Sequence, residues 1–160
     1  METVRQQSPV SERRLNMRLM AYWQDLRGTG SHAPVERFDP DAVADLWPHC
    51  FTIVPAPNPD QATFVHVGDM IAADSGLTTV GLVVSDIPAD TLLGKALHLV
   101  ADVLKVRYPI VDSGEFRDHL SRPSLYRSIL VPLSDDRGTV GLLVGGARCK
   151  VLPAEGRPSA

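Results

Sequence analysis

The chain has 160 residues, of which 44% are hydrophobic and 22% charged, and its net charge is −3 at pH 7. That length fits one domain and can bury a core that folds without a disulfide framework or a metal. Because nucleic-acid-binding domains are usually strongly basic, the acidic balance argues against such a partner.

The first predicted element is an amphipathic helix over residues 11–27, preceded by a frayed tail over 1–10. Ser11 is a favourable N-cap, and Gly28 and Gly30 end the helix. Large apolar residues recur at helical spacing along one face, namely Leu15, Leu19, Tyr22, Trp23 and Leu26. We expect this face to pack on the chain's own sheet, to form a dimer or partner contact, or to combine both.

The same helix carries basic residues on its other side, at Arg13, Arg14 and Arg18. We interpret them as a solvated face, with an acidic protein or an acidic lipid surface as the alternative.

The next part of the chain predicts short helices and a hairpin. Asp39 and Pro40 have the pattern of a helix start, and the helix over 40–46 ends at Pro48. Strands over 49–54 and 63–67 flank a turn rich in proline and acidic residues, followed by a helix over 69–74 that ends at Gly76. Residues 78–84 fit either a loop or a short strand.

The clearest helical pattern lies over residues 92–105. Its apolar stripe is continuous, and its polar side carries Lys95, His98, Asp102 and Lys105. We expect the stripe to face the sheet and His98 to face water.

The last third of the chain predicts antiparallel strands. The first covers residues 108–111 and 115–119, as one strand or as two pieces of one, and the next two cover 125–133 and 139–150. Residues 134–138 form the last turn, and this reading explains Asp135 and Asp136 better than a catalytic pair does. Hairpins with helices grouped between them predict an α+β domain over 11–151 and a frayed tail over 152–160.

A ligand cavity is one of two interpretations of the last strand. Small residues at alternate positions leave one of its faces nearly bare, so a helix packs closely there or a ligand has room beneath the long helix. The residues expected to line such a cavity are Leu93, Leu97, Val100, Gly141, Leu143 and Gly145.

No catalytic or metal site is predicted. The chain has five histidines and two cysteines, and none of them shows the spacing of metal ligands. A GxSxG nucleophile motif is missing, and Gly28 and Gly30 do not follow a strand as a phosphate-binding loop would.

Several short motifs together resemble the PAS domain family, above all the short stand-alone PAS-like proteins of alphaproteobacteria. The resemblance covers roughly residues 15–150 and rests on Tyr22-Trp23-x-x-Leu26-Arg27, Pro34, Arg37, Phe38-Asp39-Pro40, Leu46-Trp47-Pro48-His49, Cys50 to Val54, Phe64 to Gly68 and Asp74-Ser75-Gly76. It implies a five-stranded antiparallel sheet with helices on one face and an extra N-terminal helix.

The resemblance also implies a function. We expect a bacterial sensory or regulatory domain that binds a small ligand or a partner protein, forms a homodimer and signals to a separate protein. The alternatives are a ligand-free adaptor and a small α+β enzyme. No cofactor is predicted, because His98 lies on the polar side of its helix, away from a haem, and both cysteines lie in strands rather than in a flavin-reactive motif.

In a PAS sheet the first and last strands are neighbours. Cys50 begins the first and Cys149 ends the last, so the resemblance makes a redox-linked pair geometrically possible, with two separate thiols as the alternative. No apolar run reaches the roughly 18 residues of a membrane span, and residues 1–10 lack the apolar region of a signal peptide, so we expect a cytoplasmic protein.

Overall fold

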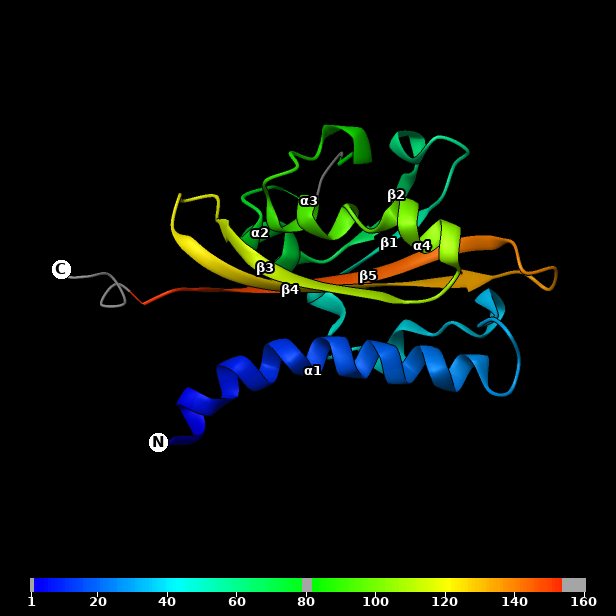
Figure 1. Ribbon diagram of the computed structural model, residues 1–160, viewed down its shortest axis with the longest axis horizontal. Coiled ribbons are helices and arrows are strands. Elements are labelled where there is room, and N and C mark those ends of the chain that lie inside the picture. Colours follow the sequence, from blue (N-terminus) through cyan, green and yellow to red (C-terminus); the bar gives the residue numbers. More distant parts are fainter. Residues whose placement is uncertain (1, 79–81, 154–160) are drawn as a thin grey trace.

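The computed structural model describes residues 2–78 and 82–153 and has an α+β architecture, as predicted. Its sheet is antiparallel, five-stranded and ordered β2-β1-β5-β4-β3 (Figure 1). The strands are β1 (Cys50–Val54), β2 (Thr63–Val67), β3 (Ile110–Arg117), β4 (Pro123–Ser134) and β5 (Val140–Val151). The α-helices are α1 (Glu2–Arg27), α2 (Asp69–Asp74), α3 (Leu92–Leu97) and α4 (Val100–Val106).

Helices cover both faces of the sheet. In Figure 1, α1 runs along one face, and α2, α3 and α4 lie over the other. Side chains alternate along each strand, so neighbouring residues of β5 enter different cores: Leu143 packs with α3 and α4, and Val144 packs with α1. The fold is therefore a three-layer arrangement with two separate apolar cores.

The hairpin of β4 and β5 is the longest part of the sheet, and its turn was predicted correctly. Asp135 accepts hydrogen bonds from the backbone N–H groups of Arg137 and Thr139, both at 2.9 Å. Gly138 has a φ of 83°, a conformation that glycine adopts without steric cost. Asp135 is thus a turn residue, and the carboxylate-pair alternative has no support.

The first predicted helix differs from the structure at its start. The first helix begins at Glu2 rather than Ser11, so the backbone of residues 2–10 is helical instead of a frayed tail. The strand β3 is continuous over Ile110–Arg117, so of the two alternatives for 108–111 and 115–119 the single strand is correct. A frayed tail is predicted over 152–160, and residues 154–160 of it lie outside the described residues.

The long helix predicted over 92–105 is wrong, because the structure has two short helices there. The backbone N–H of Leu99 bonds to the carbonyl of Ala96, a tighter bond than in an α-helix, and α4 then starts at Val100. Leu99 and Val100 are both buried as a result. An apolar stripe does not reveal this break, because both helices keep the same side toward the sheet.

The segment before α3 has little regular structure. Residues 79–81, within the ambiguous stretch 78–84, lie outside the described residues, and Val84–Asp86 form a single 3-10 turn. The backbone then approaches α3 closely: a Cβ placed on Gly94 would lie 2.1 Å from the carbonyl oxygen of Pro88. Glycine at this position lets the segment pack directly onto the helix.

Candidate functional site

The cavity predicted between the last strand and the helices is filled by protein side chains where the strand is bare. Phe51 of β1 lies directly opposite Gly145 of β5. A Cβ placed on Gly145 would lie 2.4 Å from Cζ of Phe51 and 2.8 Å from Cδ1 of Leu130. The alternative of close packing thus describes Gly145, although a strand side chain rather than a helix fills the space.

The other residues of the predicted cavity separate into three environments. Leu93 and Leu143 are fully buried in the core beneath α3 and α4. Gly141 is exposed near the end of the sheet, with no heavy atom within 4 Å of a Cβ placed there. Leu97 and Val100 belong to the same core but also line a pocket on the outer side of the helices.

This outer pocket lies between α3, α4 and the segment before them. Its volume is about 190 Å³, and its lining combines an apolar floor with a polar rim; the residues are Asp60, Val84, Ser85, Ile87, Ala89, Gly94, Leu97, His98 and Val100. Sites for small molecules usually enclose roughly 300–1,000 Å³, so this pocket has room only for a small ligand. His98 is exposed, as predicted, and stands at the rim.

The apolar face of α1 is used within the chain. Leu15, Leu19, Trp23 and Leu26 are at most 8% exposed and pack on the sheet. The indole N–H of Trp23 donates a 2.7 Å hydrogen bond to the carbonyl of Pro132. The expectation that these residues also form a dimer or partner contact needs correction, because they have no free surface.

Tyr22, the fifth residue of that predicted face, connects α1 to the loop at Asp39 through hydrogen bonds. Its hydroxyl accepts a 2.7 Å hydrogen bond from the N–H of Asp39 and donates a 3.1 Å bond to the carbonyl of the same residue. Asp39 in turn caps the following 3-10 turn through a bond from the N–H of Asp41, so its predicted capping role is confirmed. Arg18, assigned to a solvated face, forms an ion pair with Asp45.

The two cysteines cannot form the pair that the strand order suggested. Cys50 packs in the core on the α1 side, and Cys149 packs against the core on the opposite side of the sheet. Cys50 lies opposite Gly146 rather than opposite Cys149. Burial raises the pKa of the Cys50 thiol to about 12, and its Sγ donates to the carbonyl of Leu46 at 3.3 Å. Neither cysteine forms a disulfide.

A group of ionisable residues surrounds the start of β1. Burial lowers the pKa of His49 to about 4, with a further contribution from the charge of Arg148. The Nδ1 atom of His49 has no hydrogen-bond partner among the described residues. Burial also raises the pKa of Asp74, although Arg148 and His119 oppose that shift. Across residues 2–78 and 82–153, no cluster of three or more histidine, cysteine or acidic residues has a geometry for a metal ion.

Comparisons with known proteins bear on the fold. No family model and no curated protein matches the sequence. A solved light-oxygen-voltage domain, studied with a flavin analogue, superposes with a TM-score of 0.52 at 14% identity, covering 69% of this chain and 82% of that one. This chain has the PAS fold. A PAS domain from Colwellia psychrerythraea superposes with a TM-score of 0.47 at 9% identity, covering 69% of this chain and 96% of that one. A PAS domain from Bordetella pertussis BvgS superposes with a TM-score of 0.42 at 15% identity, covering 68% of this chain and 79% of that one.

Side chains fill the core of this PAS fold at Gly145. The ring of Phe51 occupies the space over Gly145 and packs edge-on against Phe64, with ring centroids 6.3 Å apart. Cys50, the more deeply buried thiol, lies on the other side of the sheet, and its raised pKa makes it a poor nucleophile. No helix in the described ranges is long and apolar enough to cross a membrane.

Proposed function

We propose that this PAS domain is a regulatory module of signal transduction that acts through contacts with other proteins, not through catalysis or a ligand in its core. The observation that carries the proposal is the packing of Phe51 and Leu130 against Gly145. A sensor that holds its ligand between sheet and helices needs free volume there, and this chain places side chains in that position instead.

The surface supports the same proposal. Among the described residues, Met17 and Val111 are 66% and 52% exposed, and both line one groove on the surface. Such residues tend to mark interaction surfaces when they occur together. The homodimer expected from the sequence stays a prediction, and the inner face of α1 is not available to it because that face is buried.

A small ligand in the outer pocket is the second candidate function. Leu97 and Val100 supply an apolar floor, while His98, Asp60 and Ser85 supply polar groups at the rim. Because α3 and α4 pack on the sheet, a ligand there would act on their position.

Native mass spectrometry of the full chain purified from its own host tests the proposal. We expect the mass of the polypeptide alone or of a protein complex. A small molecule present in most copies and released on denaturation contradicts a ligand-free module. In that event the variants His98→Trp and Phe51→Ala separate the two possible sites: filling the outer pocket removes a ligand bound there, whereas enlarging the core does not.

A further inference from the structure

An apolar groove runs between α1 and the edge strand β3. It has a volume of about 360 Å³ and is lined by Asn16, Met17, Met20, Ala21, Gln24 and Val111. Met17 is 66% exposed and Val111 is 52% exposed. These side chains therefore present apolar surface to solvent beside the edge strand β3.

A basic hollow continues the groove along β3. It also has a volume of about 360 Å³, and Ser113, Glu115, Arg127 and Lys150 are among its lining residues. Ser113 is two residues after Val111, so both lie on the side of the sheet that carries α1. Apolar surface at one end of β3 thus passes directly into basic surface at the other.

The basic residues are neighbours in the sheet. Arg127 of β4 lies directly opposite Arg148 of β5, and Lys150 is two residues further along β5 on the same face. Directly opposed like charges destabilise a sheet. Among the described residues the ion pairs are Arg18–Asp45 and Arg122–Asp118, so none of these three cations is in an ion pair there. The charge of Arg148 does act on the more distant carboxyl group of Asp74, which leaves Arg127 and Lys150 as the cations of the hollow. Glu115 brings one negative charge to the hollow against this concentration of positive charge.

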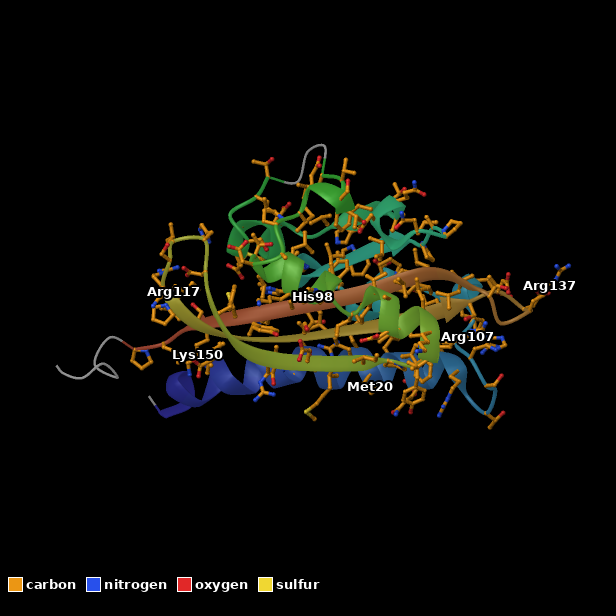
Figure 2. All side chains as sticks on the ribbon, turned by 45° about the horizontal axis from the view of Figure 1, so that its top comes forward. Met20, His98, Arg107, Arg117, Arg137 and Lys150 are labelled. Atoms are coloured by element: carbon orange, nitrogen blue, oxygen red, sulfur yellow. The ribbon has the colours of Figure 1, made fainter. Side chains whose placement is uncertain are left out.

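The edge of the sheet is available beside this surface. In the order β2-β1-β5-β4-β3, the strand β3 has a neighbour on one side only. An edge strand presents unpaired backbone N–H and C=O groups that can pair with an added extended segment. In Figure 2, Met20 lies on α1, Lys150 lies near the C-terminal end of β5, and Arg137 lies at the opposite end of the molecule from Lys150.

We propose that the α1–β3 groove binds an extended segment of a partner protein, with its apolar side chains against Met17, Met20 and Val111 and its carboxylates against Arg127 and Lys150. The inference rests on the proposed function and names the surface and the chemistry of the partner. Charge complementarity selects an acidic segment. A second copy of this chain fits poorly, because a two-fold contact through the groove would bring both sets of cations together.

The test begins with a library of random 12-residue peptides displayed against the full chain. We expect the enriched peptides to combine apolar residues with aspartate or glutamate. The affinity of one such peptide is then measured by fluorescence anisotropy for the wild type and for R127E/K150E. The double variant should weaken binding by at least about tenfold, since it replaces two attractive charges with repulsive ones.

A matched control removes the effect of net charge. The variant K105E/R137E makes the same change in charge at two exposed residues outside the groove, and we expect it to bind the peptide as the wild type does. Glutamate at position 127 faces Arg148, so folding should be preserved in R127E/K150E, which circular dichroism verifies.

Three results would overturn the inference. Equal losses in both double variants would show that only overall charge matters. Enrichment of peptides without acidic residues would refute the proposed chemistry. Binding of the full chain to vesicles containing 30% anionic lipid, abolished by R127E/K150E when no peptide is enriched, would assign the surface to a membrane. All three are independent of a ligand in the core, whose discovery would refute the proposed function and leave the groove unaffected.

Discussion

Replacing Gly145 with alanine should destabilise the domain, because the added methyl group has no space. Its carbon would lie 2.4 and 2.7 Å from Cζ and Cε1 of Phe51 and 2.8 Å from Cδ1 of Leu130. All three distances are well below the 3.5–4.0 Å separation at which carbon atoms attract one another. Inserting a methyl group into a well-packed core typically costs about 1–3 kcal/mol. The contacts come from the rigid ring of Phe51, so we expect the upper half of that range.

The exposed strand residue Gly141 supplies the matched control. No heavy atom lies within 4 Å of a Cβ placed there, so Gly141→Ala should change the free energy of unfolding by less than about 0.5 kcal/mol. Urea unfolding followed by far-UV circular dichroism measures both variants. If the clash with Phe51 is the cause, Phe51→Leu should relieve it, and the double variant should be more stable than the two single changes predict by at least about 0.5 kcal/mol. Equal stability of the Gly145 and Gly141 variants, or simple additivity with Phe51→Leu, would refute the reasoning.

Three further predictions concern buried polar groups. Burial lowers the pKa of His49 to about 4 in the folded chain, against an ordinary 6.5, so the unfolded chain takes up the proton first as the pH falls. The free energy of unfolding should therefore fall by about 1–2 kcal/mol from pH 6.5 to 4, after allowing for partial solvent screening. In acid denaturation curves, His49→Gln should reduce this pH dependence. Because burial raises the pKa of the Cys50 thiol to about 12, this residue should not react with a thiol reagent at pH 8 until urea unfolds the chain. If peptide mapping finds Cys50 labelled in the folded protein, the thiol is not buried as described. The carboxylate of Asp118 accepts hydrogen bonds from the backbone N–H groups of Leu120 and Arg122 and from Nε of Arg122. Asp118→Ala should therefore lower the free energy of unfolding by about 1–3 kcal/mol, and Asp118→Asn should lower it by less. Equal melting temperatures for both variants would argue against a stabilising role of these hydrogen bonds.

Local sequence patterns predicted most of the elements. The strands at Cys50–Val54 and Thr63–Val67 and the helix at Asp69–Asp74 agree with the prediction to within one residue. Their boundaries depend on glycine, proline and capping residues, which act within a few positions of the chain. The break between α3 and α4 escaped prediction because a single tightened backbone bond at Leu99 leaves the apolar periodicity unchanged.

The candidate site was harder to predict because it depends on strand register. Gly145 alone suggested either packing or free space, and only the pairing of β1 with β5 brings the ring of Phe51 opposite it. The same limit applies to Arg127 and Arg148, which are far apart in sequence and adjacent in the sheet. No local sequence pattern marks either residue. Two long strands joined by a tight turn are the signal that would have paired them.

The order of strands has a consequence for how the protein is made. The central strand β5 is the last of the five to leave the ribosome, yet it joins the β1–β2 pair to the β3–β4 pair. Trp23 of α1 donates a hydrogen bond to the carbonyl of Pro132 in β4, so the apolar face of α1 is covered only after β4 has been synthesised. During synthesis the helix and two unfinished half-sheets therefore coexist with their hydrophobic surfaces exposed. A nascent chain with this topology depends on chaperones or on rapid completion to avoid aggregation.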